Sequence, residues 1–213
     1  MSQTLTSAPA ARAVAATVTP CEKRSGASAP QVILTRSRFT APGYDSWVFE
    51  LDVDLPERLR PLAWMIGRWE GAGVVGYPTI ESVNFGQEVE CRHDGRNFLE
   101  WHSHTWLLDQ ETGEKVRPLS TELGFWRPGE DGRDVELLLA HPTGIIEMYY
   151  GKMEPARVTL KTDSVVRSPL AKEYNAGSRL YGLVESQLFW VMDMAAMGQE
   201  LQSHVSAQLK RVG

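Results

Sequence analysis

Cysteine is scarce in this sequence, because its 213 residues include only Cys21 and Cys91. Neither belongs to a Cys-x-x-Cys pair or to a cysteine–histidine cluster with the spacing of a zinc site, so we expect no structural zinc. We expect no disulfide between them either, because the sequence indicates a cytoplasmic protein and cytoplasmic thiols stay reduced.

Long apolar runs and concentrated positive charge are also lacking. No stretch approaches the roughly 18 unbroken apolar residues of a membrane helix. Residues 1–4 carry no positive charge ahead of an apolar core, as a secretory signal would. The net charge is −5, and no segment combines Lys and Arg with aromatic residues as a nucleic-acid groove does. We therefore expect a cytoplasmic protein that binds neither nucleic acid nor a membrane.

The composition changes near residue 30. Residues 1–30 are mostly Ala, Ser, Thr and Pro, and such a segment cannot bury enough apolar surface to offset its ordering entropy, which predicts a disordered tail. Residues 31–213 are expected to form one domain, with residues 31–51 lying on it or extending a sheet edge. Residues 55–66 have a short helical pattern that ends near Gly67, and we expect them to cover one end as a lid.

Strands and tight turns follow from Gly67 onward. Asp94 and Gly95 lie between two alternating runs, which is a strong hairpin signal. Further hairpin connections are predicted at residues 109–113 and 129–132. Strand patterns cover residues 135–140, 145–150, 157–166, 172–183, 187–194 and 204–212. The last of these would suit a helix as well.

Many strands with no long helices between them predict an all-β fold, either an antiparallel sandwich or a barrel. Closure into a barrel removes exposed strand edges. We count about ten strands, and the interior of a barrel that wide holds a ligand as well as side chains. Periodicity alone does not separate the barrel from the sandwich.

Histidine is the side chain that a metal site would need, and the chain has five. His93 precedes the Asp-Gly turn and is expected to be solvated. His102 and His104 share one strand face with Glu100, a pattern of two histidines and one carboxylate that binds metals but that the outer face of a barrel would show as well. His141 precedes a turn proline, and we assign it no role.

Several segments together resemble the nitrobindin family. They are residues 67–73 (GRWEGAG, a GxWxGxG motif), 77–80 (YPTI), 140–147 (AHPTGIIE), 171–173 (AKE) and 198–204 (GQELQSH). The GxWxGxG motif alone also begins the barrels of lipocalins and fatty-acid-binding proteins, but the segments in this order are specific together.

The resemblance spans roughly residues 62–212. It implies a ten-stranded antiparallel β-barrel of the lipocalin and fatty-acid-binding-protein kind, with haem b at one open end. It also implies ferric iron held by a histidine, nitric oxide binding, conversion of peroxynitrite to nitrate, and a homodimer.

The same resemblance assigns three residues to the haem. It makes His204 the axial ligand of the iron, although a lone histidine near a C-terminus is more often structural. It places Thr79 at the haem edge, where the residues alone indicate equally a hydroxyl that stabilises a loop. It places Lys172 beside the haem, where a cation pairs with a propionate; the residues alone indicate a solvated strand charge. Relatives carry a histidine where this chain has Ser120, which leaves a smaller group on the distal side.

The GxWxGxG motif places three glycines in the first predicted strand. Gly67, Gly71 and Gly73 inside a strand would weaken it unless a bend or a close approach of two backbones needs them. We therefore expect a sharply curved first strand, with Trp69 filling the barrel floor and its indole N–H bonded to a partner. On this interpretation the motif shapes the cavity and takes no part in catalysis.

Two other functions remain open at this stage. The first is an intracellular carrier of a fatty acid or another apolar ligand without haem. Arg179 and Tyr181 would clamp its carboxylate, although residues alternating on an outer face explain them too. The second is a structural barrel that has lost its cofactor, which the Ser120 departure raises. His204 separates these functions, because a lipid carrier does not need it.

Overall fold

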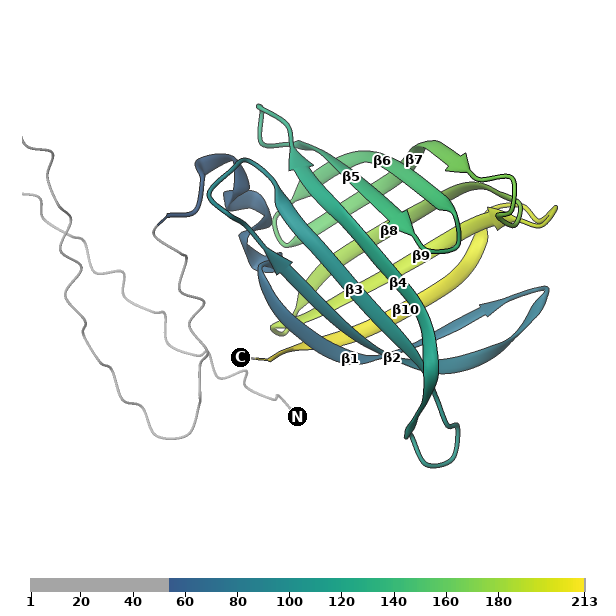
Figure 1. Ribbon diagram of the computed structural model, residues 1–213. Coiled ribbons are helices and arrows are strands. Elements are labelled where there is room, and N and C mark those ends of the chain that lie inside the picture. The colour runs from purple at the N-terminus through teal and green to yellow at the C-terminus, as the bar shows by residue number, and fades with distance from the viewer. Residues whose placement is uncertain (1–53, 213) are drawn as a thin grey trace, which may run out of the picture. The chain divides into compact units, whose positions relative to one another are not determined.

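Ten antiparallel strands close into a barrel in the computed structural model, which describes residues 54–212 (Figure 1). The strands are β1 (Gly67–Tyr77), β2 (Ile80–Arg92), β3 (Leu99–Leu108), β4 (Lys115–Pro128), β5 (Asp134–His141), β6 (Ile145–Glu154), β7 (Arg157–Arg167), β8 (Tyr174–Val184), β9 (Gln187–Ala196) and β10 (Gln202–Val212). Each strand pairs with the next, and β10 pairs with β1 to close the ring. The predicted barrel is therefore confirmed over the sandwich. The predicted tail, its boundary at residue 30 and Cys21 lie outside the described residues.

Alternation of buried and exposed side chains explains why these segments are strands. In β5, Val135, Leu137 and Leu139 are buried while the residues between them are not. This period of two is the pattern of a strand with one face on a core. The C-terminal segment, which fitted either a helix or a strand, is strand β10 with Leu209 pointing inward. One boundary was wrong: β8 begins at Tyr174, so Lys172 lies in the loop before it.

A 3₁₀ helix, η1 (Glu57–Met65), covers one end of the barrel, as the sequence predicted (Figure 1). It buries Leu59, Leu62 and Met65 completely. Its last turn is tied to the first strand, because the Trp69 indole N–H donates to the Met65 carbonyl over 2.8 Å. This end of the barrel is closed. Within the described part of the chain, no helix is long and apolar enough to cross a membrane.

The opposite end is less completely walled. Strand β4 pairs with β5 only over Leu123–Pro128, although β4 itself begins at Lys115. Likewise β7 pairs with β8 only over Arg157–Lys161, although β7 runs on to Arg167. The wall therefore opens on both sides at this end, which we call the open end. The connections β1–β2, β7–β8 and β9–β10 all lie there, because strands in an up-and-down barrel turn at alternate ends.

Candidate functional site

His204 lies on an irregular stretch of β10. The pairing with β9 runs regularly to Ser203, opposite Asp193, and resumes at Val205, opposite Met192. His204 is thus one extra residue in β10, which is a β-bulge. Bulges redirect side chains and occur next to active sites.

A second irregularity, in the pairing of β1 with β2, lies beside the first. The pairing of β1 with β2 shifts between Val75 and Tyr77, at Gly76. The Gly76 carbonyl accepts a hydrogen bond from Nδ1 of His204 over 2.9 Å. The edge of the Tyr77 ring meets the imidazole, with ring centroids 5.4 Å apart and planes at 80°. The imidazole is therefore held on two sides by neighbouring residues of β1.

Tyr77 is itself anchored across the barrel wall. Its hydroxyl accepts a hydrogen bond from the Ala196 amide over 2.9 Å, and its proton lies within reach of the Met194 and Ala196 carbonyls, at 3.0 and 3.2 Å. The side chain is buried. These contacts join β1 to β9 around the bulge of β10 and fix the position of the ring that packs on His204.

The protonation state of His204 follows from this setting. Burial lowers the pKa of the imidazole, the hydrogen bond to Gly76 opposes that effect, and the positive charge of Arg179 adds to it. The neutral ring is therefore favoured. Because a carbonyl only accepts, Nδ1 carries the proton, and the Nε2 lone pair is left free of any described residue. A neutral imidazole oriented through Nδ1 is a good axial ligand for haem iron.

The surroundings also suit a large ligand that is apolar in its body and polar at its edge. Exposed apolar side chains gather at the open end in the β1–β2, β7–β8 and β9–β10 connections or next to them. They are Ile80, Leu170, Met197 and Leu201, of which Leu170 is 98% exposed. Such a cluster is typical of a binding site. Thr79, in the β1–β2 turn, and Lys172, in the β7–β8 loop, are exposed polar groups at the same end.

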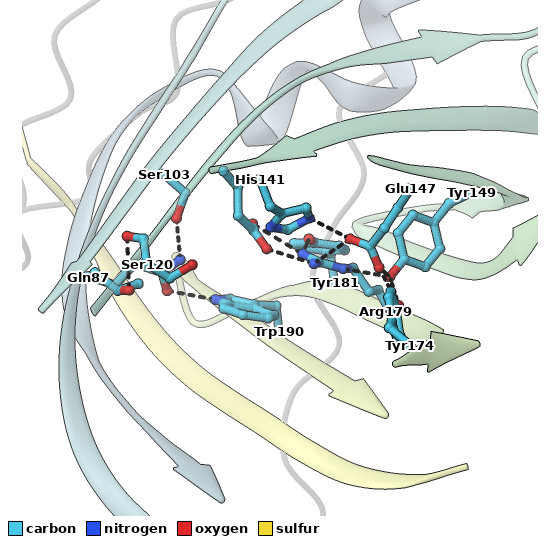
Figure 2. Close-up of polar contacts among 12 residues, drawn as sticks. Gln87, Ser103, Ser120, His141, Glu147, Tyr149, Tyr174, Arg179, Tyr181 and Trp190 are labelled. Atoms are coloured by element: carbon cyan, nitrogen blue, oxygen red, sulfur yellow. Dashed lines mark hydrogen bonds and ion pairs between the residues drawn. The ribbon is translucent and has the colours of Figure 1, made fainter. Parts of the chain in front are cut away.

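A buried polar cluster lies deeper in the barrel (Figure 2). Glu147, on β6, is 1% exposed and accepts hydrogen bonds from the hydroxyls of Tyr149, over 2.5 Å, and Tyr174. Its second oxygen lies 2.7 Å from Nε2 of His141 and 3.3 Å from Arg179. Burial opposes ionisation of Glu147, but the charge of Arg179 and the hydrogen bonds outweigh it and lower the pKa to about 2. The cluster is held as an ion pair.

Arg179 is fully engaged inside this cluster. It is 2% exposed and donates to both oxygens of Glu122, over 2.6 and 3.2 Å, and to the Tyr181 hydroxyl over 3.1 Å. The outer-face interpretation of Arg179 and Tyr181 was therefore wrong, since both point inward. The guanidinium is neutralised by two carboxylates of the protein itself, so a fatty-acid carboxylate finds no free cation there.

Residues 58–211 match the THAP4-like, heme-binding β-barrel domain family. The chain belongs to this family. It is 47% identical to a ferric nitrobindin-like protein of Kineococcus radiotolerans, over 76% of this chain and 97% of the relative. It is 49% identical to a peroxynitrite isomerase of a Nocardioides species, over 76% of this chain and 98% of the relative. The crystal structure of Rv2717c from M. tuberculosis superposes with a TM-score of 0.67 at 34% identity, covering 75% of this chain and 99% of that one.

The GxWxGxG motif of this haem-binding barrel lies in the wall and the floor. A Cβ atom on Gly73 would lie 2.2 Å from the Ser206 carbonyl oxygen and 2.6 Å from the Phe85 ring. A Cβ atom on Gly71 would lie 2.1 Å from a carbonyl oxygen of β10. The two glycines therefore let β1 and β10 approach closely. Trp69 is fully buried behind η1, and Gly67 has a φ of 131°, which favours glycine.

The remaining histidines do not assemble a metal site. His102 and His104 point outward from β3 and are exposed, with ring centroids 4.3 Å apart. Glu100 of the same strand is bonded to Arg92 over 2.7 Å. The described residues contain no group of three side chains that could hold a metal ion. His93 is half-buried in the β2–β3 connection, less solvated than predicted.

Sequence reasoning missed Glu147, Tyr149 and Tyr174 altogether. One signal was present: Glu147 occupies the inward position of β6 between Ile145 and Tyr149, where a lone carboxylate in an apolar row requires a buried partner. The partner, Arg179, is on β8, and only the closed barrel brings the two strands to one cluster.

Proposed function

We propose that this protein is a ferric haem b-binding barrel that isomerises peroxynitrite to nitrate. The observation that carries the proposal is the half-buried His204, neutral and oriented by Gly76, at the open end of a barrel of the haem-binding family. The names of its relatives, ferric nitrobindin-like protein and peroxynitrite isomerase, support the same function. When bound, ferric haem supplies a Lewis-acidic iron with an open position, where peroxynitrite anion rearranges to nitrate.

The residues at the open end would bind the haem. His204 offers Nε2 to the iron, and its hydrogen bond to Gly76 holds the ring in one orientation. Lys172 is exposed at the same end and would pair with a propionate of the haem. Thr79, in the β1–β2 turn, would donate its hydroxyl to the haem edge. Apolar side chains around these three residues exclude water from the faces of the ring.

On the distal side of the haem, opposite His204, the reaction needs no catalytic side chain. The rearrangement neither consumes nor releases a proton, so no general base is needed. Ser120 lies two residues before Glu122 on β4 and faces the same side of the strand. Its small side chain would leave room for an anionic ligand of the bound haem. Nitric oxide fits the same position and is a second ligand of this site.

Three further expectations stay predictions. The resemblance implies a homodimer, which light scattering coupled to size-exclusion chromatography measures. The sequence indicates a cytoplasmic protein, which cell fractionation checks. It also indicates that nucleic acid and membranes are not partners, which binding assays with DNA and lipid vesicles check.

The decisive experiment is reconstitution with hemin. The wild-type protein should give a sharp Soret band with high-spin ferric features and should accelerate peroxynitrite decay in stopped-flow measurements. His204→Ala should lose both. His102→Ala is the matched control, because His102 is exposed on the outer face, and it should behave as wild type. A His204→Ala protein that binds ferric haem with an unchanged spectrum would refute the assignment.

A further inference from the structure

Two buried tyrosines share one carboxylate beside the proposed haem site. The hydroxyls of Tyr149 and Tyr174 lie 3.2 Å apart, and both donate to the same oxygen of Glu147. Both side chains are buried, at 0% and 5% exposure. A Cβ atom on Gly177 would lie 2.4 Å from the Tyr174 hydroxyl oxygen and 3.0 Å from that of Tyr149. A side chain at position 177 would therefore collide with the two hydroxyls.

Tyr174 belongs to the open end. It is the first residue of β8, directly after the loop that carries Lys172. It pairs with Ala196 of β9, and the Ala196 amide donates to the Tyr77 hydroxyl. The Tyr77 ring in turn packs on His204. Three contacts, through Ala196 and Tyr77, thus connect Tyr174 to the proposed axial ligand.

An aromatic column continues from the tyrosine pair to the barrel floor. Arg179 bridges the hydroxyls of Tyr149 and Tyr181, at 3.2 and 3.1 Å. The centroid of the Tyr181 ring lies 5.0 Å from that of Trp126 and 6.0 Å from that of Trp190, which it stacks against. Tyrosine and tryptophan are the aromatic side chains that lose an electron most easily, and these three rings are neighbours.

Oxidation of a tyrosine requires a base, because the phenol proton leaves together with the electron. Burial and the nearby negative charge of Glu147 raise the pKa of Tyr174, so the phenol keeps its proton at all working pH values. Glu147 is ionised and accepts a hydrogen bond directly from that phenol. Arg179 donates to the Tyr149 oxygen, which disfavours loss of an electron there. Of the two tyrosines, Tyr174 is therefore the easier to oxidise.

We propose that Tyr174 is a redox-active tyrosine with Glu147 as its proton acceptor, and that it reduces one-electron oxidants that arise at the open end. The inference rests on the proposed function for the source of oxidant, since nitrogen dioxide radical escapes when peroxynitrite breaks without rearranging. One electron passes from Tyr174 to nitrogen dioxide, which becomes nitrite. The phenol proton passes to Glu147, and a neutral tyrosyl radical remains on Tyr174.

The first test uses the apo-protein, so that it does not depend on haem. Nitrogen dioxide is generated by radiolysis of nitrite, and 3-nitrotyrosine, formed when a second nitrogen dioxide couples with the radical, is mapped by peptide mass spectrometry. We expect nitration of Tyr174 to exceed that of Tyr150, which is its natural comparison because it is 46% exposed on the outer face of β6. Glu147→Gln should lower the nitration of Tyr174. Nitration that follows exposure, with Tyr150 foremost, would overturn the proposal.

The second test uses the haem-loaded protein and freeze-quench electron paramagnetic resonance after addition of peroxynitrite. A tyrosyl signal should appear, should be lost in Tyr174→Phe and should persist in Tyr150→Phe; persistence in Tyr174→Phe would overturn the proposal. Tyr174→Phe keeps the ring and its packing, and circular dichroism verifies its fold. Preferred nitration of Tyr174 in the apo-protein without haem loading or peroxynitrite turnover would support the redox tyrosine and count against the proposed function alone.

Discussion

The carbonyl oxygen of Gly76 accepts a hydrogen bond from Nδ1 of His204 over 2.9 Å, across 128 residues of sequence. Gly76 lies where the pairing of β1 with β2 shifts, and His204 lies at the bulge of β10. The two irregularities meet because Val75 pairs with Val205. A regular β10 would place successive side chains on opposite faces. The extra residue in β10 is therefore what lets His204 and the inward-facing Val205 follow one another.

Removal of the Tyr77 hydroxyl should loosen this arrangement. In Tyr77→Phe the Ala196 amide loses its partner, and a buried unsatisfied donor costs roughly 1–3 kcal/mol of unfolding free energy. We expect that loss in urea denaturation, together with weaker hemin binding. Tyr150→Phe, which alters an exposed outer-face residue, should change neither quantity. Unchanged hemin affinity in a destabilised Tyr77→Phe protein would mean that the ring alone orients His204.

Lys172 should contribute a charge to haem retention. Lys172→Ala should raise the hemin dissociation constant, and the difference from wild type should shrink as salt screens the pairing. Lys161→Ala removes a cation that is also exposed but lies within the β7–β8 ladder, and it is the control. Equal affinities of these two variants for hemin would remove Lys172 from the site.

Gly73→Ala should destabilise the barrel, because its Cβ would lie within 3 Å of the Ser206 carbonyl and the Phe85 ring. Overpacking of this kind costs about 1–3 kcal/mol. Gly182→Ala is matched to it, since Gly182 is also a strand glycine but its Cβ would meet only the Ala156 carbonyl, at 3.8 Å. Thermal melts of the two variants compare the costs. Similar melting temperatures would show that β1 and β10 separate easily.

Acid should weaken the fold through Glu147. The pKa of Glu147 is lowered to about 2 in the folded protein, and it is near 4.3 in an unfolded chain. Its stabilisation is therefore complete above about pH 4.3 and is lost as pH falls toward 2, with a size of about 3 kcal/mol. The gap in unfolding free energy between wild type and Glu147→Gln should narrow over this range. A gap that stays constant with pH would contradict the lowered pKa.

Ser120→His should introduce a hydrogen-bond donor on the proposed distal side. We expect slower dissociation of nitric oxide or cyanide from the ferric protein, because a donor stabilises the bound ligand. Ser120→Ala is the control, and it should leave the dissociation rate near that of wild type, since the observed Ser120 contact is the one its backbone carbonyl accepts from Thr105, at 3.2 Å. Identical dissociation rates in all three proteins would place residue 120 away from the ligand.

The sequence alone was sufficient for the strands and the family. Alternation fixes which face of a strand is buried, Asp94-Gly95 sets a turn, and both signals are local, so the barrel strands and the η1 lid could be read from residues near one another. The assignment of His204 came from a resemblance of short segments in order, not from its own chemistry, and it stays a prediction.

The closed barrel decided which distant residues meet. Its closure turns Arg179 of β8 toward Glu122 of β4 and Glu147 of β6, and it places Gly76 under His204. Strand alternation specifies whether a side chain points into or out of the barrel. It does not specify which side chain it meets across the interior, because that depends on how the strands tilt and stagger around the ring. The loop position of Lys172, the inward turn of His204 at its bulge and the shared proton acceptor of Tyr149 and Tyr174 are therefore properties of the tertiary structure.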